Sequence, residues 1–153
     1  MAETPQSRLK ALGIELHALA PPAAKYVPWI RTGNLIFVSG QVSGVPGNAI
    51  KGKLGATMSV EQGQQAARLC AINILAVLND ALAGDLDKVK RIVKLTGFVN
   101  VTGDFEEAHK VVNGCSDLIT EILGDKGKHA RSAVGMANLP LGFAVEVEAI
   151  VEV

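Results

Sequence analysis

The feature that most constrains the fold is a change in the spacing of apolar residues along the chain. Two segments, one beginning near Ser59 and one near Asp104, place apolar side chains at helical spacing, and each ends at a glycine. Between them, from Lys88 to Val101, the period changes to two, which is typical of a strand. Long helices interleaved with strands in this way predict an α+β domain.

The remaining segments extend this prediction. The pattern favours a short helix from Ser7 to Leu16 and a hairpin that turns at Thr32-Gly33-Asn34. The glycine-rich stretch 44–55 is expected to be an exposed loop. Two strands should follow Ala130, joined through residues 138–142. The predicted order is hairpin, helix, strand, helix and two strands, with both helices on one face of a sheet.

Local signals predict the helix starts and the strand faces. Ser59 and Gln62 form a capping box, and Asp104 with Glu107 is expected to cap the second helix. Strict alternation in the central strand places the following residues on one face: Val89, Arg91, Val93, Leu95 and Val99.

Composition limits the classes of partner. Lys plus Arg total 15 and Asp plus Glu total 15, so the formal charge is zero, which argues against nucleic acid or an anionic membrane as partner. The hydrophobic fraction is 48% without a run long enough to span a membrane, and the other face of the sheet lacks a cover within the chain. We therefore expect a homo-oligomer of one domain, residues 1–153, with residues 1–20 as an N-terminal extension carrying the short helix.

The distribution of reactive residues indicates neither a metal nor a cofactor. Cys70 and Cys115 fall in the predicted helices among apolar neighbours, as buried thiols do. The three histidines show no ligand spacing, and phosphate-loop, dinucleotide and serine-hydrolase motifs are absent from the sequence. The polar N-terminus lacks a signal peptide, so the expected location is the cytoplasm.

Two residues near the C-terminus could carry chemistry. Arg131, at the start of a predicted strand, could clamp a planar carboxylate through two parallel hydrogen bonds, or could pair with a surface carboxylate of the protein itself. Glu146 lies in a strand whose alternate residues are apolar. It could belong to a solvated sheet face, or it could line a cleft as a general base.

Several stretches resemble the Rid (YjgF/YER057c/UK114) family. They are Tyr26-Val, Val38-Ser-Gly-Gln, Asp104-Phe, and above all Ala130-Arg-Ser-x-Val followed by Leu139-Pro and Val145-Glu-Val-Glu-Ala-Ile. The resemblance implies a chorismate-mutase-like α+β fold and a homotrimer with ligand clefts between subunits. It also implies hydrolytic deamination of 2-imino and enamine acids to 2-keto acids and ammonia.

The resemblance assigns residues position by position. Arg131 matches the family's carboxylate-binding arginine and Glu146 the glutamate that positions or activates water. Tyr26 matches an aromatic residue at the cleft, and Ser39 a polar residue on its wall. The departures concern substrate binding: His109 stands where the deaminating branch usually has Asn, and Ala133 replaces a frequent Cys.

Two other functions stay open at this point. The chain could be a trimeric binding or chaperone-like protein for a carboxylate-bearing molecule, without catalysis, which the departures at His109 and Ala133 favour. It could also be an endoribonuclease or translation inhibitor of the L-PSP type, a label that relatives carry. The neutral charge argues against that third function.

Overall fold

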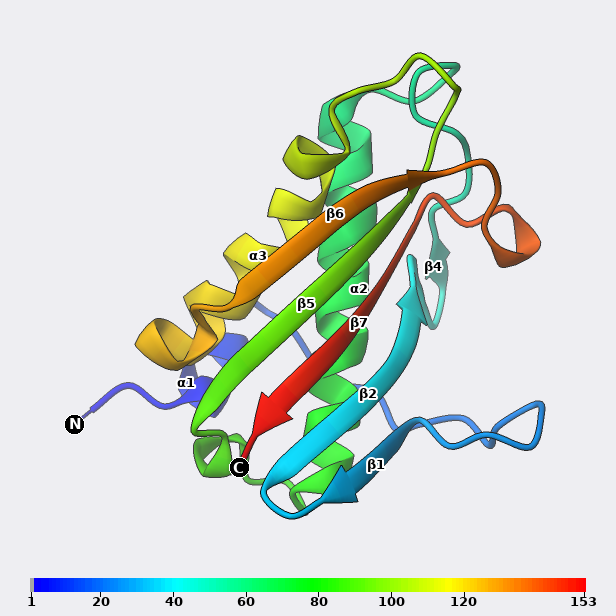
Figure 1. Cartoon of the computed structure of the whole chain (residues 1–153). Coiled ribbons are helices and arrows are strands. Elements are labelled where there is room, and N and C mark those ends of the chain that lie inside the picture. The colour runs from blue at the N-terminus through cyan, green and yellow to red at the C-terminus, as the bar shows by residue number, and fades with distance from the viewer. Residues whose placement is uncertain (1) are drawn as a thin grey trace.

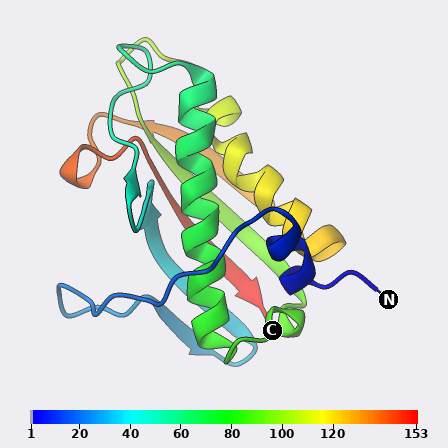
Figure 2. The same ribbon diagram turned by 180° about the vertical axis from the view of Figure 1, so that it is seen from behind.

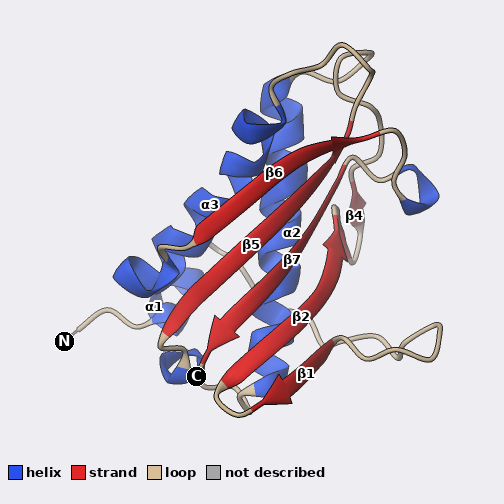
Figure 3. Cartoon of the chain, in the orientation of Figure 1, coloured by secondary structure: helices blue, strands red, loops and turns tan. Residues whose placement is uncertain are grey.

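The computed structural model describes residues 2–153, which form one mixed sheet with helices on one side (Figures 1 and 3). The sheet has five strands in the order β1-β2-β7-β5-β6. β6 runs parallel to β5, and the other neighbours are antiparallel. The strands are β1 (Trp29–Thr32), β2 (Leu35–Val42), β5 (Arg91–Asn100), β6 (Ala130–Met136) and β7 (Val145–Glu152). The predicted α+β class and element order are confirmed.

Two long helices cover one face of the sheet, α2 (Val60–Ala81) and α3 (Ala108–Leu123). Figure 2 shows them from behind, with the N-terminal segment running across α2. The predicted capping box is present: Ser59 Oγ accepts from the backbone N–H of Gln62, and Gln62 Oε1 accepts from the backbone N–H of Ser59. The helical stripes point into the core and include Cys70, Ile74, Cys115 and Ile119, all fully buried. Helical spacing therefore predicted the core-facing sides correctly.

The N-terminal helix starts earlier than predicted. α1 spans Pro5–Ala11, because Thr4 caps its first turn and Pro5 fits the first helical position. The segment after α1 is tied to α2 by His17, whose Nε2 lies 2.7 Å from Asn73 Oδ1. The Asn73 amide donates in turn to the carbonyls of Val42 and Gly44 at 3.0 and 2.7 Å, so one buried side chain joins three segments.

Three local predictions are wrong. The second helix starts at Ala108 without a side-chain cap, and the Asp104 carboxylate instead accepts from the Thr102 hydroxyl at 2.7 Å. In β5 a register shift between Ile92 and Lys94 interrupts the alternation, so Ile92 is buried and Val93 is exposed. A bulge of this kind inserts one residue and reverses the faces that follow it.

The third wrong prediction is the exposed loop at residues 44–55. β3 (Gly44–Val45) and β4 (Asn48–Ala49) form a small hairpin there, and Leu54 is fully buried. The Lys53 ammonium donates to Asn100 Oδ1 at 2.7 Å and to the carbonyls of Val101 and Ala137. The glycines predicted an exposed loop, and neither the hairpin nor the tertiary bonds that hold this segment against the end of β5 were predicted.

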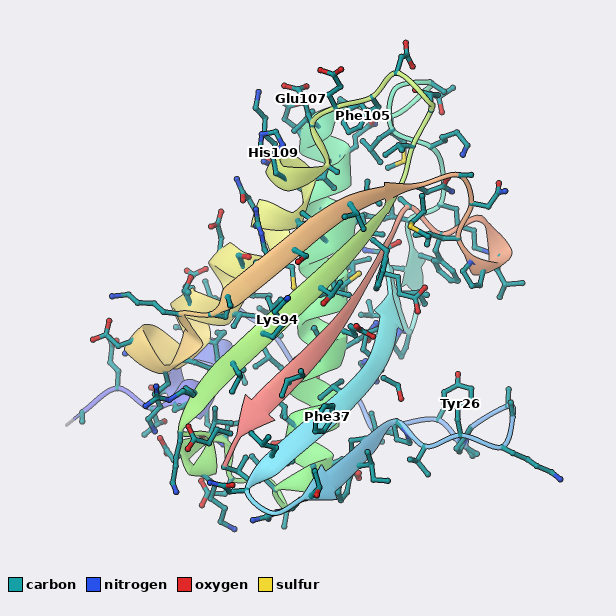
Figure 4. All side chains as sticks on the ribbon, in the orientation of Figure 1. Tyr26, Phe37, Lys94, Phe105, Glu107 and His109 are labelled. Carbon is teal, nitrogen blue, oxygen red and sulfur yellow. The ribbon has the colours of Figure 1, made fainter. Side chains whose placement is uncertain are left out.

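The face of the sheet opposite the helices carries exposed apolar side chains. Figure 1 looks onto this open face, and Figure 4 shows Phe37 and Lys94 on it. Its large exposed apolar residues are Ile30, Phe37, Val134 and Met136. The expectation that another subunit covers this face stays a prediction. No helix within residues 2–153 combines the length and the apolar character needed to cross a membrane.

Candidate functional site

Arg131 lies on the edge strand β6, and its guanidinium turns toward α3. Nη1 donates to Asn113 Oδ1 at 2.8 Å and to Ser116 Oγ at 3.1 Å. Nη2 donates to the backbone carbonyl of His109 at 3.1 Å. A guanidinium has five N–H groups, and these three bonds leave the Nε–H and one Nη2–H. The side chain is half-buried, so it is held in place by the helix while part of it still reaches the surface.

Three residues of α3 form the cradle for this guanidinium. His109, Asn113 and Ser116 follow one another at spacings of four and three, which places them on one side of the helix. His109 contributes its carbonyl only, and its side chain is exposed near the start of α3 (Figure 4). The amide that meets Arg131 therefore comes from Asn113, one turn later. Sequence reasoning missed Asn113 and Ser116, although their spacing from His109 was a usable signal.

Ala133 lies on the same side of β6 as Arg131, two residues further along. It pairs with Gly97 and packs, half-buried, against the hydrophobic core. A Cβ at Gly97 would lie 2.6 Å from Val112 Cγ2, so α3 approaches the sheet closely at this point. The small side chain of Ala133 thus occupies little of the space beside the arginine.

Glu146 lies on β7 and points to the opposite, open side of the sheet. Its carboxyl lines a pocket of about 390 Å³ together with Tyr26, Gly40, Leu141 and Phe143. Burial, and to a smaller extent the Glu148 carboxylate, raise the pKa of Glu146 above its ordinary value. A half-buried carboxylate with a raised pKa in a pocket is a stronger base than an exposed one.

Gly40 makes the room for the Glu146 carboxyl. It lies where the pairing of β2 with β7 shifts register, between Val38 and Gln41. A Cβ built on Gly40 would fall 2.1 Å from Glu146 Oε1, a distance that two non-bonded atoms cannot keep. A glycine inside a strand often marks such a close approach.

Substituting Gly40 with alanine should therefore move the Glu146 carboxyl without unfolding the protein. The obstacle is the far end of a flexible side chain, so we expect a loss of stability below about 1 kcal/mol. If Glu146 is catalytic, kcat should fall at least tenfold, because a misplaced base loses much of a contribution of about 10²–10⁴. Thermal unfolding and steady-state kinetics of the same preparation separate the two effects. Unchanged kcat would contradict a role for this carboxyl position.

Tyr26 lines the pocket of Glu146, and Ser39 lines a neighbouring pocket on the same open face. Tyr26 is 62% exposed and projects from the long connection before β1 (Figure 4). It lines both the Glu146 pocket and a second pocket of about 500 Å³ that includes Ser39, Lys94 and Glu148. The Ser39 hydroxyl donates to the Val27 carbonyl at 2.6 Å and so holds the connection that carries Tyr26.

Within one chain, Arg131 and Glu146 lie on opposite faces of the sheet. Arg131 pairs with Leu95, which is fully buried under the helices, whereas Glu146 pairs with Phe98. Residues three apart in a strand point to opposite faces, and β5 separates the two strands concerned. The structure thus forms two half-sites: an arginine cradle at the sheet edge, and a carboxyl pocket on the open face.

Thiolate chemistry and a metal site have less support among the described residues. Burial raises the pKa of the Cys115 thiol to about 12 and that of Cys70 well above its ordinary value, so both remain protonated. Among residues 2–153, no three His, Cys, Asp or Glu side chains gather closely enough to hold a metal ion.

Comparison with known proteins identifies the family. The profile described as "YjgF/chorismate mutase-like, putative endoribonuclease" matches residues 6–152. Protein TCP17 of Trypanosoma cruzi is 49% identical over 148 residues, which cover 95% of this chain and 92% of TCP17.

Solved structures of two bacterial proteins are similar to this fold over nearly the whole chain. Atu1372 of Agrobacterium tumefaciens has 49% identity and a TM-score of 0.90, covering 98% of this chain and 93% of that one. A Shewanella oneidensis structure, whose name carries the same endoribonuclease label, has 36% identity and a TM-score of 0.93, covering 99% and 100%. The resemblance seen in the sequence is thereby confirmed: the chain belongs to the YjgF/chorismate-mutase-like family.

Proposed function

We propose that this protein hydrolyses 2-imino acids and their enamine tautomers to 2-keto acids and ammonia. Water adds to the carbon of the C=N bond, and the resulting carbinolamine expels ammonia as the C=O bond forms. The substrate needs one anchor for its carboxylate and one group that orients and deprotonates water. The electrophilic carbon is already activated, so the proposal requires neither a cofactor nor a metal.

The observation that carries the proposal is the held guanidinium of Arg131. Three acceptors on α3 fix its orientation, and its two remaining N–H groups are the number that a bidentate carboxylate needs. Fixing the donor beforehand lowers the entropic cost of binding. In this account His109 acts through its carbonyl, and Ala133 shapes the space next to the guanidinium.

Glu146 would act as the base. Its raised pKa, caused first by burial, makes the carboxylate a stronger base toward water. Tyr26 would cover the bound substrate, and Ser39 would hold the segment that carries Tyr26.

The two half-sites lie on opposite faces of one sheet, so we propose that Arg131 of one subunit meets Glu146 of its neighbour in a homotrimer. Two features support this arrangement. The open face exposes apolar residues that include Phe37 and Val134. Leu141, at the rim of the Glu146 pocket, is 81% exposed in the left-handed conformation (φ 57°), which is unusual for a leucine. Subunit contact would bury such side chains.

We propose the cytoplasm as the compartment. Both cysteines are free thiols, which fits a reducing environment. The endoribonuclease label belongs to the family description and to some relatives. The zero net charge gives that activity no electrostatic support on this chain.

The direct test is keto-acid release from 2-imino acids generated in place by an amino-acid oxidase, with semicarbazide to trap free imine. Wild type should accelerate keto-acid release over trapping, and Arg131→Ala should abolish the acceleration. Arg91→Ala is the matched control, because Arg91 is exposed and pairs with Glu152 on the protein surface. If wild type binds keto acids through Arg131 without accelerating hydrolysis, the protein is a carboxylate-binding relative and the enzymatic proposal fails.

A further inference from the structure

Beside Arg131, His129 is hydrogen-bonded to Ser116, one of the three residues that hold the guanidinium. Ser116 Oγ, on α3, is 2.9 Å from His129 Nε2, just before β6. His129 Nδ1 is 2.6 Å from the carbonyl oxygen of Gly127. Ser116 Oγ also accepts from Arg131 Nη1 at 3.1 Å. Four groups are thus joined in one chain of hydrogen bonds.

The chemistry of these groups fixes the direction of every bond. A carbonyl only accepts, so His129 Nδ1 carries the hydrogen, and a neutral imidazole then has its lone pair on Nε2. That lone pair accepts the Ser116 hydroxyl hydrogen. The Ser116 oxygen is left with lone pairs only, and one of them faces Arg131, which can only donate. The neutral state of His129 therefore makes Ser116 an acceptor for the guanidinium.

The Gly127 end of this series of hydrogen bonds is held in place by backbone packing. Gly127 is buried, and a Cβ built on it would lie 2.7 Å from the carbonyl oxygen of Ile119 on α3. The Gly127 carbonyl therefore has little freedom to move away from His129. Ser116 sits within α3, whose neighbours Cys115 and Ile119 are fully buried. Both ends of the pair are attached to a rigid part of the fold.

We propose that Ser116 and His129 are positioning residues for Arg131, and that protonation of His129 weakens the bond from the guanidinium to Ser116, one of the three bonds that hold it. The effect on ligand binding rests on the proposed function, in which Arg131 holds the substrate carboxylate. The positioning itself does not, and it can be measured in the ligand-free protein.

Protonation reverses one bond of the chain. Nε2 then carries a hydrogen and must donate to Ser116, so two cations, the imidazolium and the guanidinium, share one hydroxyl oxygen. The Asp125 carboxylate already pairs with the Lys128 ammonium at 2.8 Å in solvent, so it does not fully balance the new positive charge. The charged groups on the elements around His129 are Arg91 and Lys94 on β5, Lys110, Asp117 and Glu121 on α3, Asp125, Lys126 and Lys128 at the turn, and Arg131 on β6.

Nuclear magnetic resonance of the full chain without ligand tests the positioning. The guanidinium Nη signals of Arg131, assigned from their loss in Arg131→Lys, should be resolved at pH 7.5 and should broaden as the pH is lowered to about 5. In His129→Gln the amide oxygen can still accept from Ser116 but cannot titrate, so the signals should stay resolved across that range. Ser116→Thr, which keeps the hydroxyl, should behave as wild type, whereas Ser116→Ala should broaden the signals at every pH.

A binding measurement tests whether this series of hydrogen bonds from Gly127 to Arg131, the relay, affects ligand binding at Arg131. With 2-oxobutanoate as probe, the Kd of wild type should rise about tenfold between pH 7.5 and the acid end of the titration. His129→Gln should hold the Kd at its neutral value. Arg131 signals that ignore pH in wild type, or that broaden equally in His129→Gln and Ser116→Ala, would overturn the positioning role. Resolved and pH-sensitive Arg131 signals without 2-oxobutanoate binding would support the relay and count against the proposed function instead.

Discussion

Substitution of Glu146 with glutamine is expected to lower kcat for imine hydrolysis by about 10²–10⁴-fold, the range that a positioned base contributes. Glutamine has nearly the same shape as glutamate, so it should still fit beside Gly40 and leave KM nearly unchanged. The amide cannot accept a proton from water, and the loss should therefore appear in the chemical step.

The matched control is Glu148→Gln, two residues along the same face of β7. Its carboxylate is one of the causes that raise the pKa of Glu146, after burial. Removing it should leave kcat at neutral pH nearly intact and shift the acid limb of the pH profile to lower pH. Equal losses in both variants would show that the face needs charge in general rather than a base at Glu146.

Stability should respond to the same substitution with a defined sign. Because the pKa of Glu146 is raised, the folded protein binds this proton more tightly than the unfolded chain does. The contribution of Glu146 to the free energy of unfolding is therefore fully present at pH values below the ordinary carboxyl pKa, and it is lost as pH rises through the raised value. Denaturant titrations should find Glu146→Gln more stable than wild type at pH 7, by a margin that shrinks toward pH 4.

The second large effect should come from Gly114→Ala, at the contact between α2 and α3. A Cβ at Gly114 would lie 2.0 Å from the backbone oxygen of Gln64. Backbone cannot swing aside as a side chain does, so the two helices would have to separate. We expect a loss of about 3 kcal/mol in the free energy of unfolding, the upper end for overpacking, despite the higher helix propensity of alanine.

Thermal unfolding measures this loss directly. For a chain of this size the melting temperature should fall by about 6–12 °C. Gly103→Ala is the control, since a Cβ there would meet no atom within 4 Å, and its melting temperature should change by no more than about 2 °C. A Gly114→Ala protein as stable as the control would mean that α2 and α3 do not approach each other this closely.

The helices and the hairpin were predictable because their signals are local. Helical spacing predicted the buried sides of α2 and α3, and the capping box at Ser59 predicted the start of α2. Gly33-Asn34 predicted the first turn. The bulge near Val93 was not predictable, since an inserted residue leaves the alternating composition of the strand almost unchanged. The closed hairpin at residues 44–49 was not predictable either, because it depends on tertiary bonds such as that from Asn73 to the Gly44 carbonyl.

The candidate site also has features that the sequence could indicate and features that it could not. Arg131 and Glu146 were identifiable by the segments around them, but their placement on opposite faces depends on strand register, which the sequence does not reveal. The contact between Gly40 and Glu146 joins residues far apart in the chain. Asn113 and Ser116 share a helix side with His109, so helical spacing could have indicated these two members of the cradle.

The central claim is that each active site combines Arg131 of one subunit with Glu146 of another. The most direct test mixes two inactive variants, Arg131→Ala and Glu146→Gln, under conditions that exchange subunits, with exchange verified by native mass spectrometry. Random pairing should restore about a quarter of the wild-type activity, because only one of the four possible neighbour combinations carries both intact residues. Mixed assemblies that remain as inactive as either variant alone would contradict a site shared between subunits.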